Sequence, residues 1–143
     1  MVPEVIPFLF EHIDQLDIQD RQAPDVAWLR SVQESLALEE MSSYTVRAGA
    51  RVLACGGVFE INPWRGFAWA LLAKSLGHDF IYVHRVSARL FAAVPYARIE
   101  YEVDIDFDAG HRWARMLGFE METARVRKYR EDGSDVTRYV MVR

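Results

Sequence analysis

The sequence predicts one α/β domain that contains at least one strand–helix–strand crossover near its middle. Three observations lead there. The apolar pattern changes along the chain from helical spacing to strand-like runs and back. A continuous apolar run is followed first by an amphipathic segment and then by an alternating one, the order of a crossover. Finally, 143 residues, of which 51% are hydrophobic, suit one core, so we expect a single domain over residues 1–143.

The first third of the chain is expected to be helical. Ile6, Leu9 and Ile13 are among apolar residues that recur every three or four positions, which predicts a short helix over residues 4–17. Pro24 breaks the pattern and opens a second helix, expected from Asp25 to about residue 40.

The next segments read as strands. Residues 44–48 and 51–61 are rich in β-formers and meet at a glycine, which predicts a hairpin. A second turn at residues 62–66 leads into the apolar run 67–73, which fits a fully buried strand.

A polar loop at 74–79 precedes an amphipathic helix over 81–94 that Pro95 ends. Residues 98–107 alternate, so we expect a strand with an acidic face, from Glu100 to Asp106, that is either wet or turned to a ligand. A helix over 108–117 follows, with Asp108 as its cap and Gly118 just past its end. Residues 122–142 complete the chain as a hairpin around the turn 131–134.

Composition excludes several functional classes. The net charge of −4 gives no general attraction to nucleic acid. No apolar run is long enough to span a membrane and no signal peptide is evident, so we expect neither membrane attachment nor export. The single cysteine, Cys55, leaves a buried thiol in a reducing compartment as the simplest expectation, hence a cytoplasmic protein. The histidines and carboxylates form no metal-ligand spacing, so no metal site is expected.

One segment resembles a known family. Trp113-Ala114-Arg115-Met116-Leu117-Gly118-Phe119-Glu120 is similar to the segment that closes the last helix of the GCN5-related N-acetyltransferase (GNAT) superfamily and opens the next strand. The order of elements resembles that family over nearly the whole chain. The size and loose motif content are closest to small, divergent members encoded by bacteriophages. The resemblance implies a GNAT-like domain with a mixed, mostly antiparallel sheet.

The resemblance also implies a cofactor, acetyl-CoA, lying between two splayed parallel strands, here 67–73 and 98–107. Its pyrophosphate would lie on the loop that precedes the central helix, and Arg85 or Arg89 would reach the 3′-phosphate end. The loop residues concerned are Lys74, Ser75, Leu76, Gly77, His78 and Asp79. The loop departs from the family pattern, since only Gly77 offers a glycine and Asp79 adds a negative charge.

For catalysis, the family commonly uses a glutamate as base and a tyrosine as proton donor to the leaving thiolate. Glu60 is the nearest match for the base. Ala114 stands where the tyrosine would be, and His111 is a candidate replacement acid.

The resemblance therefore implies acyl transfer from acetyl-CoA to an amine of a protein or small molecule. The degenerate loop and the missing tyrosine leave an alternative open: a non-catalytic protein of the same fold that binds and modulates a partner protein such as a host enzyme, or serves as a phage structural component.

Overall fold

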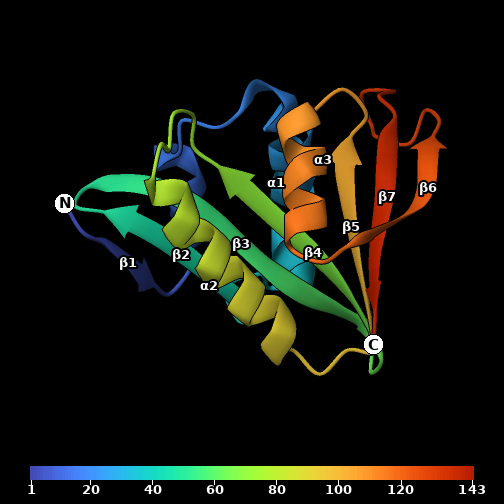
Figure 1. The fold of residues 1–143 in the computed structure, drawn as a ribbon, viewed down its shortest axis with the longest axis horizontal. Helices are drawn as coiled ribbons and strands as arrows, with labels where there is room; N and C mark the ends of the chain where they lie inside the picture. The colour runs from blue at the N-terminus through green and yellow to red at the C-terminus, as the bar shows by residue number, and fades with distance from the viewer.

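In the computed structural model, which describes residues 1–33 and 37–143, seven strands form one sheet with helices on both faces (Figure 1). The elements in chain order are β1 (Pro3–Ile6), η1 (Phe10–Gln15), η2 (Asp20–Gln22), α1 (Ala23–Leu36), β2 (Ser42–Ala48), β3 (Arg51–Asn62), β4 (Arg65–Leu72), α2 (Asp79–Ala93), β5 (Arg98–Asp104), α3 (Asp108–Met116), β6 (Glu120–Val126) and β7 (Val136–Val142), where η marks a 3₁₀ helix.

The predicted crossover is confirmed. The strand order is β1-β2-β3-β4-β5-β7-β6. β4 and β5 pair in parallel and are joined through α2, whereas every other neighbouring pair of strands is antiparallel. The sheet is therefore mixed and mostly antiparallel, as expected. Both expected hairpins are present, one between β2 and β3 and the other between β6 and β7.

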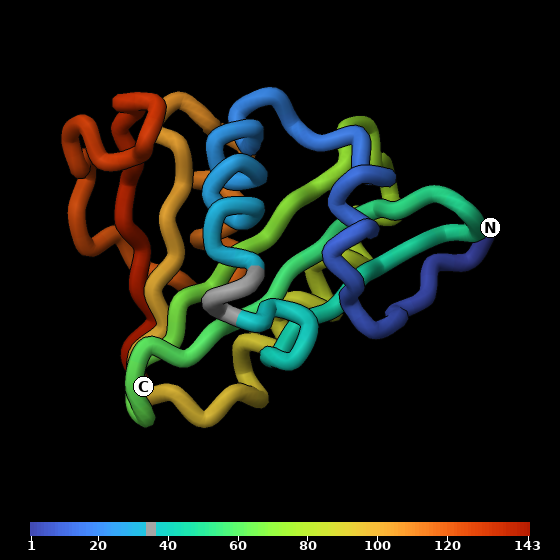
Figure 2. Tube along the Cα trace, turned by 180° about the vertical axis from the view of Figure 1, so that it is seen from behind, coloured from blue at the N-terminus to red at the C-terminus, as the bar shows by residue number. Residues whose placement is uncertain are grey.

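The helices divide the core into two layers. α2 and α3 cover one face of the sheet and α1 covers the other, as the opposite views in Figures 1 and 2 show. Val83, Phe91 and Trp113 belong to the cluster beneath α2 and α3. Phe8 and Leu29 belong to the cluster on the α1 face. The site described below lies where the sheet opens between these two layers.

The N-terminal helix predicted over residues 4–17 is wrong. The chain instead forms the edge strand β1 and then the short 3₁₀ helix η1. Pro7 disfavours a helical conformation at Ile6, the residue before it. β2 offers a free edge, along which Val5 pairs with Val46 and Ile6 with Thr45. A pairing partner some forty residues away thus overrides a helical spacing that two prolines already weaken.

Several boundaries differ by a few residues. α1 ends at Leu36 rather than near residue 40, and Ala37 adopts a left-handed conformation with φ of +46°. α2 begins at Asp79, two residues early, so the loop before it is shorter than expected. β5 ends at Asp104, where the chain turns. Asp108 does not cap α3 with its side chain, but Gly118 has the expected positive φ of +97°.

The acidic face of β5 is not a wet one. Glu100 and Asp104 are only 4% and 6% exposed, and both accept hydrogen bonds from arginines. A buried carboxylate needs such partners, because burial disfavours its charged form. Exposure to water is therefore wrong for Glu100 and Asp104, whereas Asp106, beyond the end of β5, is exposed.

Cys55 is a free, buried thiol, as expected, and burial raises its pKa to about 12. Across the described residues, no helix has the length and apolar character needed to cross a membrane. Within the same residues, no three histidine, cysteine or acidic side chains gather in a way that could hold a metal ion.

Candidate functional site

The two parallel strands at the centre of the sheet separate partway along their length. β4 and β5 pair from Arg65 opposite Arg98 to Ala68 opposite Tyr101. Beyond that point β4 continues to Leu72 and β5 to Asp104 without pairing to each other. The strands converge near the C-terminus and diverge toward the opposite end (Figure 1). The result is a V-shaped opening between these two strands, as the family resemblance implied.

A glutamine side chain covers the edge of β4 inside this opening. Because the Ala73 N–H bonds to Leu53 on β3, the alternation of a strand directs the backbone groups of Ala70 and Leu72 toward the opening. Gln22 Nε2 donates to the Ala70 carbonyl at 2.8 Å, and the Leu72 N–H donates to Gln22 Oε1 at 2.9 Å. Gln22 is 3% exposed and takes the place that a further strand would occupy.

The loop between β4 and α2 lies at the wide end of the opening. Gly77 has a φ of +57° and open space where a side chain would begin. The backbone N–H groups of residues 75–78 have no acceptor among the described residues. Those of Asp79, Phe80 and Ile81 each bond to a carbonyl three residues back, at 3.2 Å. Free backbone N–H groups before a helix suit an anionic phosphate.

The side chains of this loop give mixed support for an anion. Lys74 brings a cation, but its Nζ pairs with Asp20 at 2.9 Å. His78 is almost fully exposed, and its Nε2 lies 4.0 Å from the Asp79 carboxylate. Arg85 is exposed further along α2. The loop therefore fits a pyrophosphate through its backbone, whereas the Asp79 carboxylate, and Asp20 beside Lys74, oppose an anion.

The two predicted catalytic residues do not lie together. Glu60 is at the end of β3, opposite Gly66, where β4 and β5 are still paired. It is exposed and does not line the cavity described below. Burial, together with the neighbouring Glu60 carboxylate, raises the pKa of Tyr96.

His111 lies in the first turns of α3, and both of its ring nitrogens have partners. Nδ1 is 2.7 Å from the Tyr139 hydroxyl, and Nε2 is 3.0 Å from the Ile105 carbonyl. These contacts join α3 to β7 and to the turn after β5. Ala114, one turn further on, is fully buried in the core.

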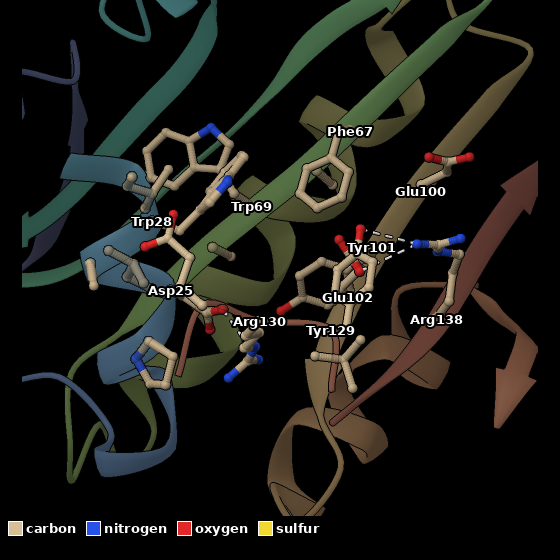
Figure 3. A pocket seen from close by; sticks show the side chains of 18 of the residues that line it. Asp25, Trp28, Phe67, Trp69, Glu100, Tyr101, Glu102, Tyr129, Arg130 and Arg138 are labelled. Atoms are coloured by element: carbon tan, nitrogen blue, oxygen red, sulfur yellow. Dashed lines mark hydrogen bonds and ion pairs between the residues drawn. The ribbon is translucent and has the colours of Figure 1, made fainter. Parts of the chain in front are cut away.

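A cavity of about 700 Å³ adjoins the opening on the α1 side (Figure 3). Its walls come from α1, β4, β5 and the turn between β6 and β7. Its lining includes Asp25, Trp28, Phe67, Trp69, Glu100, Tyr101, Glu102, Tyr129, Arg130 and Arg138. Trp69 and Glu102 are among the residues at which the two strands have parted, so cavity and opening are continuous.

Asp25, Arg130 and Asp104 form a chain of ion pairs along one wall. Arg130 lies 3.2 Å from a carboxylate oxygen of each aspartate, and its side chain is 10% exposed. Burial raises the pKa of Asp25 to about 7, against the opposing effect of the Arg130 charge, while the nearby Asp104 and Glu102 add to the rise. Asp25 can therefore gain or lose a proton near neutral pH.

Glu102 and Arg138 face the cavity from the opposite wall. Arg138 Nη2 is 3.5 Å from Glu102 Oε2 and donates to the Tyr129 hydroxyl at 3.2 Å. Burial raises the pKa of Glu102 despite the Arg138 charge.

Glu100, two positions earlier on the same strand, accepts hydrogen bonds from Arg65 and Arg98. Burial opposes its ionisation, but these hydrogen bonds outweigh burial and hold the pKa of Glu100 below its usual value. The pKa values of these two carboxylates, which share one strand face, are thus shifted in opposite directions.

Sequence reasoning missed the most perturbed carboxylate and its partner. The sequence pattern places Asp25 only at the start of a helix. Arg130 lies in the basic stretch 125–130, which on a hairpin is typical of a solvent-exposed face. The acidic alternation of β5 was the usable signal. It pointed to a face that could be turned to a ligand, and arginines elsewhere in the chain were the natural candidates to neutralise it.

The fold is that of the GNAT acetyltransferases. No protein-family model and no curated protein matches the chain by sequence. Among solved structures, Ard1 from Thermoplasma volcanium shares 13% identity and a TM-score of 0.75, over 99% of this chain and 98% of that one. A spermidine N-acetyltransferase from Vibrio cholerae, solved with CoA and spermine, shares 13% identity and a TM-score of 0.67, over 98% and 95%. A putative acetyltransferase from T. thermophilus shares 19% identity and a TM-score of 0.63, over 98% and 85%.

Proposed function

We propose that the protein transfers an acyl group from acetyl-CoA to an amine that binds in the cavity. The observation that carries the proposal is the continuity of two sites. The parallel strands part after Ala68 and Tyr101, and a cavity with a titratable carboxylate opens at that place. A donor and an acceptor bound on the two sides would meet between the strands, and such positioning is itself a large part of catalysis.

The donor side would use the loop before α2. The free N–H groups of residues 75–78 and the N-terminal end of α2 would bind the pyrophosphate, with Arg85 further along the helix. Acetyl-CoA, when bound, supplies a thioester that an amine can attack. Because Gln22 already bonds the edge of β4, we expect the cofactor to gain little from that edge and most from the loop.

The acceptor side would use Asp25 as the proton acceptor. An amine arrives mostly as ammonium at neutral pH and must lose a proton before it can attack. A carboxylate with a pKa of about 7 is a stronger base than an ordinary aspartate, and about half of it is still ionised at neutral pH. The proton would pass from the ammonium nitrogen to an oxygen of Asp25.

This proposal moves the base from Glu60 to Asp25, because Glu60 lies outside the cavity lining. His111 holds α3 against β7 through both of its ring nitrogens. We therefore assign it a positioning role rather than the role of proton donor to the thiolate.

The direct test is calorimetric titration with acetyl-CoA and with free CoA, supported by thermal melting. A ligand at 100 times its dissociation constant should stabilise the fold by about 2.7 kcal/mol, which raises the melting temperature by several degrees. Release of the CoA thiol in the presence of an amine panel then tests transfer. Absence of binding at millimolar acetyl-CoA would overturn the proposal.

A matched pair of variants locates the cofactor. Gly77→Asp and Gly77→Asn place side chains of nearly equal size at a left-handed residue with open space around it, and both residues tolerate that conformation better than most. Only Gly77→Asp adds a negative charge. We expect it to weaken acetyl-CoA binding about tenfold relative to Gly77→Asn, the effect of about 1.4 kcal/mol of charge repulsion.

The non-catalytic alternative has one observation in its favour. Trp64, at the turn between β3 and β4, is 64% exposed, and exposed aromatic residues often anchor protein interfaces. If acetyl-CoA does not bind, a pull-down with wild type and with Trp64→Ala as bait tests this alternative. Partners lost with Trp64→Ala would support it.

A further inference from the structure

The residues that line the cavity carry polar atoms that make no hydrogen bond within the described part of the chain. Among the described residues, four buried side-chain nitrogen or oxygen atoms have no hydrogen bond: Trp69 Nε1, Glu102 Oε2, Arg130 Nη2 and Arg138 Nε. All four belong to residues that line this one cavity. Buried polar groups are otherwise almost always bonded, so their concentration here points to a ligand with matching groups.

Three of the four atoms are donors. Arg130 Nη2 already lies 3.2 Å from an Asp25 carboxylate oxygen, so Trp69 Nε1 and Arg138 Nε are the two that call for an oxygen acceptor. Trp69 is 5% exposed, and its indole nitrogen can only donate. Arg130 is engaged through both terminal nitrogens, Nη1 with Asp104 and Nη2 with Asp25, each at 3.2 Å, whereas Arg138 is engaged through Nη2 with Tyr129. The Arg138 guanidinium is thus held in place with its Nε left without a partner. A carbonyl or carboxylate oxygen is the complementary group.

The fourth atom is an acceptor and calls for a donor, preferably a cationic one. Glu102 Oε2 is buried beside Arg138 at 3.5 Å without a hydrogen bond. The Asp25 carboxylate faces the same cavity from α1 (Figure 3). A primary ammonium group carries three donors and a positive charge and would satisfy Glu102.

The remaining lining is apolar and aromatic. Trp28 lies 5.7 Å from Phe67 between ring centroids, and both line the cavity together with Tyr101. A volume of about 700 Å³ lies within the range of about 300–1,000 Å³ that small-molecule sites occupy. The ligand should therefore have an apolar side group as well as its two polar ends.

We propose that the cavity binds an α-amino-acyl group with an apolar side chain, presented either by a free amino acid or by the first residue of a peptide. Its ammonium would bind at Glu102 and Asp25, and its oxygen at Trp69 Nε1 and Arg138 Nε. As a statement about the acyl acceptor this rests on the proposed function, whereas the binding itself needs no acetyl-CoA. A polyamine does not fit, because it has no oxygen for Trp69 Nε1 and Arg138 Nε.

The test is calorimetric titration of the wild-type protein, without acetyl-CoA, against ligands that share a phenyl group. L-phenylalanine carries both polar ends, 2-phenylethylamine only the amine, and 3-phenylpropionate only the carboxylate. We expect L-phenylalanine to bind at least about tenfold more tightly than either, a difference of about 1.4 kcal/mol, with spermine weaker still. Equal or tighter binding of 2-phenylethylamine or spermine would overturn the proposal, as would no binding of L-phenylalanine.

A fourth ligand, L-phenylalaninamide, distinguishes the two sources. It offers the same amine beside a neutral carbonyl oxygen, as the first residue of a peptide does. Tighter binding of the amide than of L-phenylalanine supports a peptide N-terminus, and the reverse order supports a free amino acid.

Two variants assign the two ends. Trp69→Phe removes the indole N–H and keeps an aromatic ring. It should weaken the binding of L-phenylalanine several-fold and leave the binding of 2-phenylethylamine unchanged. Glu102→Gln should weaken the binding of both amines and leave the binding of 3-phenylpropionate unchanged. Glu120→Gln, an exposed carboxylate outside the cavity, is the control, and thermal melting checks each fold. If neither variant separates the ligands in this way, the assignment of the ends is wrong.

These titrations are independent of the cofactor test. Amino-acid binding without acetyl-CoA binding would overturn the proposed function and keep the ligand class. Acetyl-CoA binding with the opposite ligand order would keep the function and overturn the ligand class.

Discussion

The two sides of the opening between β4 and β5 are built in different ways. On the cavity side, partly or fully buried charged residues from α1, β5 and the β6–β7 turn form ion pairs with each other. Arg130 links Asp25 to Asp104 in this way. On the loop side, His78 is almost fully exposed, and a side chain at Gly77 would meet nothing within 4 Å. Side-chain contacts between distant segments hold the cavity, whereas backbone turns hold the loop. Substitutions in the cavity should therefore alter stability as well as function, and substitutions in the loop should alter ligand binding alone.

The largest expected effect is on catalysis, in Asp25→Asn. General-base catalysis contributes typically about 10²–10⁴-fold, and we expect kcat to fall by about that factor in a thiol-release assay. In the wild type, kcat should rise with pH up to about 7, as Asp25 loses its proton, and then level off. This rise should vanish in the variant.

The competing candidate for the base is tested in the same assay. If Glu60→Gln lowers kcat as much as Asp25→Asn, or if Asp25→Asn keeps the pH profile of the wild type, the assignment of Asp25 is wrong. Glu120→Gln again serves as the control for a lost carboxylate.

Arg130→Met should cause the largest loss of stability. It leaves the buried Asp104 carboxylate and the partly buried Asp25 carboxylate without their shared cation. Removal of one partner from a buried ion pair typically costs about 3–5 kcal/mol. Chemical denaturation should show a loss of this size, whereas Arg127→Met, at an exposed position of the same turn, should change little. Similar losses in the two variants would contradict the contrast between cavity and loop.

Gln22→Ala should destabilise the opening itself. The substitution leaves the Ala70 carbonyl and the Leu72 N–H buried without partners, and each such group costs about 1–3 kcal/mol. We expect a total loss of roughly 2–4 kcal/mol in the free energy of unfolding. The control is Gln33→Ala, at an exposed position of α1. If the loss is absent but acetyl-CoA binds more tightly, water or cofactor replaces Gln22 readily.

Asp25 also predicts a pH dependence of stability. Its pKa is about 7 in the folded protein against 3.8 in the unfolded chain, so between these values the folded state binds more protons. Its contribution to stability is therefore full below about pH 4 and is lost as the pH rises to about 7. The free energy of unfolding of Asp25→Asn, measured relative to the wild type, should improve over this window. A constant difference from pH 4 to pH 8 would show that Asp25 titrates normally.

Most of the fold, but only part of the site, could be predicted from the sequence. Periodicity and turn residues predicted the crossover and both hairpins, because these are local patterns. The prediction from helical spacing was wrong at Pro3–Ile6, where pairing with a distant strand decides the structure. The opening between β4 and β5 followed from the resemblance, but the chemistry of the cavity did not. Asp25 and Arg130 lie at opposite ends of the chain, and Gln22 is 50 positions from Leu72. Neither contact can be predicted from a local sequence pattern.

The smallest expected effect is that of Lys74→Met on the loop side. The Lys74 ammonium pairs with Asp20 at 2.9 Å, but both side chains are well exposed, and exposed ion pairs contribute little to stability. The unfolding midpoint should therefore stay within experimental error of the wild type. Acetyl-CoA should nevertheless bind a few-fold more weakly and with less dependence on salt, because one cation near the phosphates is lost. Arg130→Met should show the reverse, a large loss of stability, and with the protein still folded its acetyl-CoA affinity should be nearly unchanged. If Lys74→Met instead destabilises the fold without altering binding, the loop is a structural element and the phosphates bind elsewhere.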